Sequence, residues 1–185
     1  MDIRKNALLF QKFDQLELTT CLRLNGYCHK LLPRQFFSVI SRLGDGAAWF
    51  TLLLLLPVFY GVTGLQVSAS MALTGLVCTL IYKTLKSSLI RTRPFLNSPD
   101  ILCGTAPLDR YSFPSGHTMH AVCFSVMVIH FCPIFALVVV PFTVLIALSR
   151  VVLGLHYPTD VIVGALLGWA VAAIGIAISH STFVY

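Results

Sequence analysis

Charged residues are scarce in this sequence, and long parts of it have none. Only 11% of the 185 residues are Asp, Glu, Lys or Arg, whereas soluble domains average about a quarter. Hydrophobic residues make up 57% of the chain. Three stretches lack any formal charge, namely 46–82, 111–149 and 161–185. This composition excludes a disordered chain, a nucleic-acid-binding arm and an ordinary cytosolic enzyme. It indicates a membrane protein that crosses the bilayer several times.

Other absences narrow the function further. The six cysteines show no C-x-x-C spacing, and the three within apolar runs, Cys78, Cys123 and Cys132, are interpreted as small buried hydrophobic residues. The chain has no internal repeat and no low-complexity tract. The net charge of +6 would suggest nucleic acid in a soluble protein. Beside membrane spans it predicts pairing with anionic lipid headgroups instead.

Five segments are apolar enough to cross a bilayer, which takes about 20 residues of helix. They are Ala47–Leu65, Val67–Leu85, His117–Phe131, Ile134–Leu153 and Val161–Ser179. The third is short unless Ser115 and Gly116 begin the same helix. The last contains several Gly and Ala residues, which allow close helix contact, so we expect it to pack inside the bundle. The predicted fold class is all-α, a polytopic membrane bundle of about five to six helices.

The segment before the first span has a different pattern. Hydrophobic residues recur at helical spacing with charges between them, and the pattern is interrupted at Asn25-Gly26. This predicts two amphipathic helices that lie in the membrane interface. The alternative is that Cys21–Leu32 dips into the bilayer as part of a sixth span. We therefore divide the chain into an amphipathic interfacial segment, 1–45, and a transmembrane bundle, 46–185.

All charged residues fall on one membrane face when the five spans are threaded. The N-terminal segment, the connection 83–110 and the turn 150–160 lie on that face, and the opposite connections have no formal charge. One interpretation is the positive-inside bias, which would make this face cytoplasmic. The other is that a polar site is assembled there, so that its own cations distort the count.

Three polar clusters on that face could carry chemistry. They contain Lys86, Arg93 and Pro94, then Ser115, Gly116 and His117, and finally Arg150, His156 and Asp160. The clusters supply three cations, and the two guanidiniums among them can bind phosphate oxygens in pairs. Ser115 and Gly116 stand where a helix begins, so free backbone N–H groups would face an anion. Together these groups predict a phosphate cradle.

The histidines add reactive groups to this cradle. Asp160 follows His156 by four positions, so its carboxylate can accept the ring N–H and leave the other nitrogen free to attack phosphorus. His117 is a second imidazole that can protonate a leaving oxygen. The set describes hydrolysis of a phosphomonoester through a phosphohistidine.

Each cluster also has a simpler interpretation. The PSGH tetrapeptide could be only a helix N-cap, and His156 with Asp160 only a structural pair. A metal site is disfavoured because three cations around the histidines would repel a divalent ion, and no cofactor is expected. Charged residues next to membrane segments are energetically costly. If each cluster had only a structural role, their common position on one membrane face would be a coincidence.

Together the clusters resemble the three-part signature of the type 2 phosphatidic acid phosphatase family. The motifs are Lys86-x6-Arg93-Pro94, Pro114-Ser115-Gly116-His117 and Ser149-Arg150-x5-His156-x3-Asp160, which match in order, spacing and position relative to the spans. The resemblance covers about residues 36–178 and implies a helical bundle that removes phosphate from lipid phosphates or diphosphates without a metal. It assigns the nucleophile to His156, its orienting residue to Asp160 and the general acid to His117. It assigns phosphate binding to Lys86, Arg93, Ser115, Gly116 and Arg150.

The compact size resembles bacterial members of that family, which act on phosphatidylglycerophosphate, phosphatidic acid, undecaprenyl diphosphate or lipid A. The sequence does not choose among these substrates, although the loop before the third span offers candidate selectivity residues, namely Asn97, Asp100, Asp109 and Tyr111. The resemblance implies the plasma (inner) membrane, with the active site on the periplasmic or outer face. The predicted function is an integral membrane lipid phosphatase. The alternative is a non-catalytic protein that binds or transports lipid phosphates, which would need the cations but not both histidines and Asp160.

Overall fold

The computed structural model of the chain describes residues 3–182, with side chains over residues 14–179. Within this part every regular element is helical. The longer helices are α1 (Ile3–Asn25), α2 (Leu31–Arg42), α3 (Ala48–Leu89), α5 (Gly116–Phe131), α6 (Ala136–Val152) and α7 (Pro158–Thr182). Short helical segments lie between them, namely η1 (Gly26–His29), η2 (Leu43–Ala47), α4 (Pro94–Asn97) and η3 (Pro133–Phe135). The all-α membrane bundle predicted from the sequence is confirmed.

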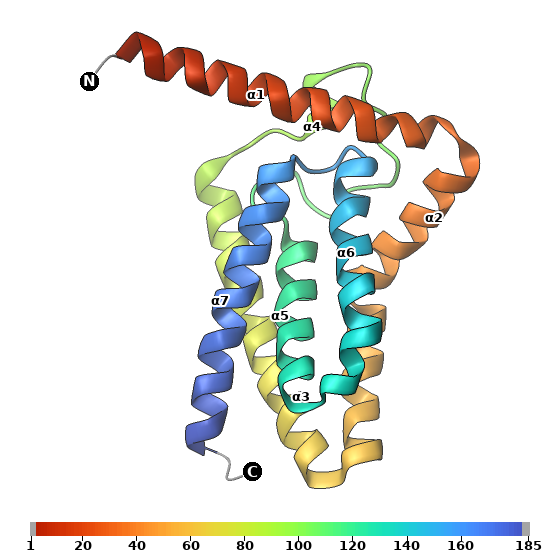
Figure 1. The fold of residues 1–185 in the computed structure, drawn as a ribbon, viewed down its shortest axis with the longest axis vertical. Helices are drawn as coiled ribbons and strands as arrows, with labels where there is room; N and C mark the ends of the chain where they lie inside the picture. The colour runs from red at the N-terminus through yellow and green to blue at the C-terminus, as the bar shows by residue number, and fades with distance from the viewer. Residues whose placement is uncertain (1–2, 183–185) are drawn as a thin grey trace.

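Helix α3 is a hairpin that supplies the first two predicted spans. The chain breaks at Gly61, whose φ of 56° lies in the left-handed region that glycine adopts without a Cβ clash. Gly64 then lies so close to the first arm that a Cβ would come within 2.1 Å of the carbonyl oxygen of Leu56. Figure 1 shows the first arm running away from the α1 end of the bundle and the second returning toward that end. The predicted spans Ala47–Leu65 and Val67–Leu85 placed the connection between them around Gly64–Gln66. It falls earlier because Gly61 makes the turn and Gly64 packs the arms together.

Helices α5 and α7 approach each other closely because α7 presents glycines to α5. A Cβ on Gly168 would come 2.2 Å from the carbonyl oxygen of Met119, and one on Gly164 would come 2.6 Å from that of Ser115. No side chain fits at these two positions. The close contact expected of the last helix is found on this face, and it fixes the two helices whose first turns carry His117 and Asp160. The expectation that this helix packs inside the bundle is wrong, because Ile162, Leu166 and Trp169 on its other face are more than half exposed.

The outer surface of the bundle is apolar, as contact with lipid chains requires. Large hydrophobic side chains more than half exposed lie on several helices, including Leu54, Val58, Leu73, Leu137 and Leu166. Helices α6 and α7 are long and apolar enough to cross a membrane, and so is the helical stretch that contains α3. Helix α5 is shorter, begins at Gly116 and has Ser115 as its N-cap. The chain is therefore a membrane protein.

Helices α1 and α2 correspond to the two predicted amphipathic helices, and the break between them follows Asn25 as expected. Helix α1 crosses one end of the bundle (Figure 1). Helix α2 packs against α6, and the chain then kinks at Gly46 in η2, whose φ is 147°, before α3 begins. Exposed side chains such as Leu32 and Val39 give α2 an apolar outer surface. The kink at Gly46 adjoins the predicted division after residue 45, and the assignment of an interfacial segment and a transmembrane bundle to its two sides remains a prediction.

Candidate active site

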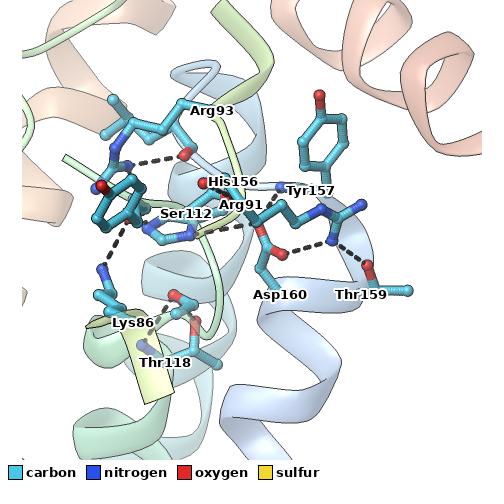
Figure 2. Close-up of polar contacts among 12 residues, drawn as sticks. Lys86, Arg91, Arg93, Ser112, Thr118, His156, Tyr157, Thr159 and Asp160 are labelled. Carbon is cyan, nitrogen blue, oxygen red and sulfur yellow. Dashed lines mark hydrogen bonds and ion pairs between the residues drawn. The ribbon is translucent and has the colours of Figure 1, made fainter. Parts of the chain in front are cut away.

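The predicted site residues gather at the end of the bundle that α1 crosses. Six of them line one cavity of about 790 Å³, namely Lys86, Arg93, Gly116, His117, Arg150 and His156. The other two, Ser115 and Asp160, are fully buried and are joined by a hydrogen bond of 3.0 Å from the Ser115 N–H to the Asp160 carbonyl. Segments far apart in the sequence therefore meet at one polar site (Figure 2).

His156 lies in the turn between α6 and α7 and is 1% exposed. Its Nε2 is 3.4 Å from Nη1 of Arg93. Because a guanidinium can only donate, Nε2 carries the free lone pair and Nδ1 carries the ring proton. Burial, reinforced by Arg150, Arg93 and Lys86, lowers the pKa of His156 well below its ordinary value. The imidazole is therefore neutral, with its lone pair directed toward the cations.

Asp160 lies behind His156 in the first turn of α7. Its Oδ2 accepts a hydrogen bond of 2.9 Å from the backbone N–H of Tyr157 and lies 3.6 Å from Nδ1 of His156. The second distance exceeds a normal hydrogen bond, and Nδ1 makes no other hydrogen bond among the described residues. The predicted pair is brought together, and a shift of a few tenths of an ångström would close the contact.

Lys86 and Arg93 converge on one carboxylate, that of Asp109 in the loop between α4 and α5. Nζ of Lys86 lies 2.7 and 2.8 Å from its two oxygens, and Nη2 of Arg93 lies 2.7 Å from Oδ1. Arg93 also donates to the carbonyl oxygen of Leu155, and Lys86 to that of Tyr111. Burial by itself would raise the pKa of Asp109, but the two cations outweigh it and hold that pKa below its ordinary value. An anion thus occupies the place where the sequence predicted phosphate.

Arg150, near the end of α6, is the third predicted cation and is buried. Its Nη1 donates to Oγ of Ser41 in α2, and its Nε makes no hydrogen bond within residues 14–179. None of the ion pairs found among those residues involves Arg150. A buried guanidinium without a carboxylate partner is strongly stabilised when an anion binds to it.

The tetrapeptide that opens α5 has two structural uses. Oγ of Ser115 accepts a hydrogen bond of 3.5 Å from the N–H of Thr118, so the N-cap interpretation is confirmed. A Cβ on Gly116 would come within 3.3 Å of the Tyr82 ring, which leaves little room for any side chain. Gly116 and His117 line the cavity, so the positive end of the α5 dipole opens onto it.

His117 contacts a residue that the sequence did not predict. Its Nε2 is within hydrogen-bonding distance of Oδ1 of Asp45, which belongs to η2. The two side chains are 11% and 33% exposed, so the pair lies at the open edge of the cavity. The one signal in the sequence is that Asp45 is the last charge before the uncharged stretch 46–82.

Two of the four candidate selectivity residues reach the cavity, namely Asp109 and Tyr111. Asn97 instead donates a 2.8 Å hydrogen bond to the hydroxyl of Tyr157, and Asp100 is exposed.

Arg91 was not among the residues predicted from the sequence, although its Nη1 lies 2.6 Å from Oδ1 of Asp160. No local pattern separates Arg91 from the other basic residues around Lys86 and Arg93.

A buried neutral imidazole, three cations and a second histidine surround one cavity in a membrane bundle, an arrangement whose charge suits an anionic group. Residues 63–183 match the PAP2 superfamily, and the chain belongs to this family. The family predicted from the three motifs is thereby confirmed. It is a family of lipid phosphatases.

Individual relatives agree with this assignment. An undecaprenyl-diphosphatase from Sulfolobus acidocaldarius is 27% identical over 144 residues, which cover 77% of this chain and 68% of that protein. The crystal structure of LpxE from Aquifex aeolicus matches with a TM-score of 0.73 at 29% identity, covering 84% of this chain and 92% of that one. A transmembrane PAP2-type phosphatidylglycerolphosphate phosphatase from Bacillus subtilis matches with a TM-score of 0.74 at 23% identity, covering 96% and 89%. This last similarity concerns the fold alone.

Proposed function

We propose that this protein hydrolyses the terminal phosphate of a lipid phosphate or diphosphate, with His156 as the nucleophile. The observation that carries the proposal is the convergence of Lys86 and Arg93 on one anion, the Asp109 carboxylate, beside Nε2 of His156. A phosphate in place of that carboxylate would contact both cations and lie within reach of the nucleophilic nitrogen.

The first step transfers the phosphoryl group to the protein. Nε2 of His156 forms a bond to phosphorus while the bond from phosphorus to the lipid oxygen breaks, and that oxygen takes a proton from His117. Lys86, Arg93 and Arg150 bind the non-bridging oxygens, where they stabilise charge in the transition state. Asp160 would accept a hydrogen bond from Nδ1–H once the 3.6 Å separation closes, and its negative charge would stabilise the positive charge that the imidazole gains as the phosphohistidine forms.

The second step restores the protein. Water gives a proton to His117 and attacks phosphorus, the bond between nitrogen and phosphorus breaks, and inorganic phosphate leaves. His156 returns to its neutral form and His117 to its protonated form. The sum is lipid phosphate plus water giving lipid alcohol plus phosphate, or lipid monophosphate plus phosphate from a diphosphate.

The shape of the cavity supports a lipid substrate. Beyond the cations it is lined by apolar side chains of the two α3 arms and of α5, including Trp49, Phe50, Leu53, Leu76 and Phe124. A headgroup phosphate at Lys86 and Arg93 would therefore leave its hydrocarbon chain against an apolar wall. Phosphatidylglycerophosphate, phosphatidic acid, undecaprenyl diphosphate and lipid A all present this combination of an anionic end and an apolar body.

The proposed reaction needs no metal. Three cations supply the charge that a divalent ion would otherwise bring to the phosphoryl oxygens. Among the residues the structure describes, no three His, Cys, Asp or Glu side chains are grouped to hold a metal ion. Retention of activity in EDTA is the corresponding expectation.

We place the protein in the plasma (inner) membrane with its active site on the periplasmic or outer face, as the family resemblance implies. The segment 1–45 would then lie in the outer interface, where its basic residues meet anionic headgroups. This placement opposes the positive-inside bias. The positive-inside rule compares basic residues in the connections on the two faces. It discriminates poorly here, because the connections at the far end of the bundle have no formal charge.

Phosphate release from a panel of lipid phosphates and diphosphates, measured in detergent with EDTA, tests the proposal. The parent protein should turn over at least one of them, and acid quenching should trap a phosphoenzyme. His156→Ala, folded as judged by its thermal melting temperature, should show neither. Binding of lipid phosphates without any release would instead support a non-catalytic binding or transport protein, and turnover by His156→Ala would remove His156 as the nucleophile.

A further inference from the structure

Hydrogen bonds hold the carboxylate of Asp160, which lies 3.6 Å from Nδ1 of His156. Oδ2 accepts the Tyr157 N–H, and Oδ1 accepts a hydrogen bond of 2.6 Å from Nη1 of Arg91. Arg91 reaches Asp160 and Thr159 together, as Figure 2 shows. Its guanidinium also lies over the Tyr157 ring, with Cζ 4.1 Å from the ring centroid. The orientation of Asp160 therefore depends on where this guanidinium is fixed.

A glutamate of the N-terminal helix fixes the other side of Arg91. Oε2 of Glu17, in α1, accepts a hydrogen bond of 2.6 Å from Nη2 of Arg91. Oε1 accepts two more from Thr159, at 2.8 Å from its N–H and 2.5 Å from its hydroxyl. Glu17 is buried although the rest of its helix carries several exposed residues. The hydrogen bonds of this carboxylate therefore go to Thr159, which precedes Asp160 in the sequence, and to Arg91, which contacts Asp160.

We propose that Glu17 and Arg91 are positioning residues of the active site, which act on His156 through Asp160. The proposal rests on the proposed function, because it takes His156 as the nucleophile. Arg91 occupies Oδ1 of Asp160, so Oδ2 stays directed at Nδ1 of His156. Glu17 keeps Arg91 in that place and shares its charge.

The charges of this group favour the reaction. Glu17 and Asp160 are two carboxylates that share the single guanidinium of Arg91, so the group retains one net negative charge beside Nδ1. Attack by Nε2 places positive charge on the imidazole, which that negative charge stabilises. Glu17→Gln would leave Asp160 fully neutralised by Arg91 and would remove this effect.

A purely structural role for Glu17 would be to attach α1 to the bundle. Helix α1 has a separate attachment at Asn25, whose side chain donates to the carbonyl oxygens of Leu102 and Val152 at 2.9 Å and accepts from the Leu102 N–H at 2.7 Å. Asn25 touches no group of the Glu17–Arg91–Asp160 chain in these contacts. It therefore provides a matched control for loss of α1 docking alone.

The first measurement is steady-state phosphate release from the best lipid phosphate in the panel. Glu17→Gln should lower kcat on the order of 10- to 100-fold and leave KM unchanged, because the loss falls on transition-state alignment. Asn25→Ala should lower the melting temperature without this loss of kcat per folded molecule, and Asp14→Asn, an exposed charge of the same helix, should change neither. In the Asp160→Asn background, Glu17→Gln should have no further effect. An equal loss in both backgrounds, or an unchanged kcat, overturns the proposal.

A second measurement does not depend on turnover. Inorganic orthovanadate adopts the geometry of phosphoryl transfer and bonds to the nucleophile, whereas inorganic phosphate reports only the cations. By calorimetry, Glu17→Gln should weaken vanadate binding about tenfold and change phosphate binding by less than about twofold. Parallel losses for both anions, or none for vanadate, contradict a positioning role. If Glu17→Gln does not fold, Glu17→Asp keeps the charge on a shorter side chain. It should also weaken vanadate binding more than phosphate binding, by a smaller factor.

The two measurements separate this proposal from the proposed function. If the parent protein releases no phosphate from any lipid, the proposed function fails, and the ratio of vanadate to phosphate affinity still decides whether Glu17 positions His156. If the parent turns over and His156→Ala does not, while Glu17→Gln keeps full kcat, the positioning proposal alone fails.

Discussion

Asp109 and Arg93 form an ion pair of 2.7 Å inside the cavity, although Arg93 is one of the groups proposed to hold the substrate phosphate. The same carboxylate also binds Lys86. Asp109 is 37% exposed at its side chain and belongs to a loop, so it can leave without unfolding a helix. In the proposed reaction, substrate phosphate and Asp109 would therefore compete for the same two cations.

Asp109→Asn should tighten the binding of phosphate-bearing ligands. Removing the competing charge frees Lys86 and Arg93, so we expect the dissociation constant of inorganic phosphate to fall about three- to tenfold, measured by calorimetry. Asp100→Asn is the control, because it removes an equally charged but exposed residue of the same loop. A weaker affinity in Asp109→Asn would show that this carboxylate organises the cations rather than blocking them.

His117→Ala should be most harmful with poor leaving groups. A general acid contributes on the order of 10²- to 10⁴-fold when the departing oxygen needs a proton, and much less when that oxygen is already stable. We expect kcat for an alkyl lipid phosphate to fall within that range, and kcat for an aryl phosphate such as p-nitrophenyl phosphate to fall far less. Equal losses on the two substrates would assign His117 another role.

Stability should decline as pH falls from about 7 to 5, and His156 should contribute to the decline. Its pKa is lowered in the folded protein, so below about pH 6.5 the unfolded chain binds a proton that the folded chain does not. That difference costs at most about 1.4 kcal/mol of unfolding free energy per pH unit. Melting temperatures against pH should therefore fall less steeply for His156→Gln than for the parent. His29→Gln, at an exposed site, should follow the parent, and identical slopes for all three would contradict the assignment.

Labelling in intact cells should decide which face carries the site. Asp100→Cys places a thiol in the exposed loop at the active-site end, and Thr63→Cys places one after the α3 turn at the opposite end. With the native cysteines retained, a membrane-impermeant thiol reagent should add label to Asp100→Cys and not to Thr63→Cys. The reverse pattern would place the active site in the cytoplasm.

The sequence predicted the bundle well because hydropathy over some 20 residues does not depend on long-range contacts. Its error at the first hairpin has a local cause. Gly61 and Gly64 are both plausible turn residues, and only packing decides that Gly64 lies against the carbonyl of Leu56. The kink between α2 and α3 was within reach of the sequence, because Gly44 and Gly46 flank Asp45 and the chain does leave helical geometry at Gly46.

The residues of the candidate site were predictable where spacing carries the information. Asp160 follows His156 by four positions, and Arg93 precedes a proline that ends the helical pattern. Glu17 lies 74 positions from Arg91, and no periodicity links them. Asp45 is likewise 72 positions from His117. Such contacts arise only when α1 and η2 are folded against the bundle.

The glycine contacts between α5 and α7 determine which wall of the cavity can be redesigned. At Gly164 and Gly168 the backbones of α5 and α7 are so close that no larger residue fits. These two helices also carry His117 and Asp160, which take part in the proposed phosphoryl transfer. The α3 hairpin forms the opposing wall with side chains such as Leu53 and Leu76, which are free of that restriction. A mutant library intended to alter lipid preference should therefore diversify the hairpin and leave the α5–α7 seam untouched.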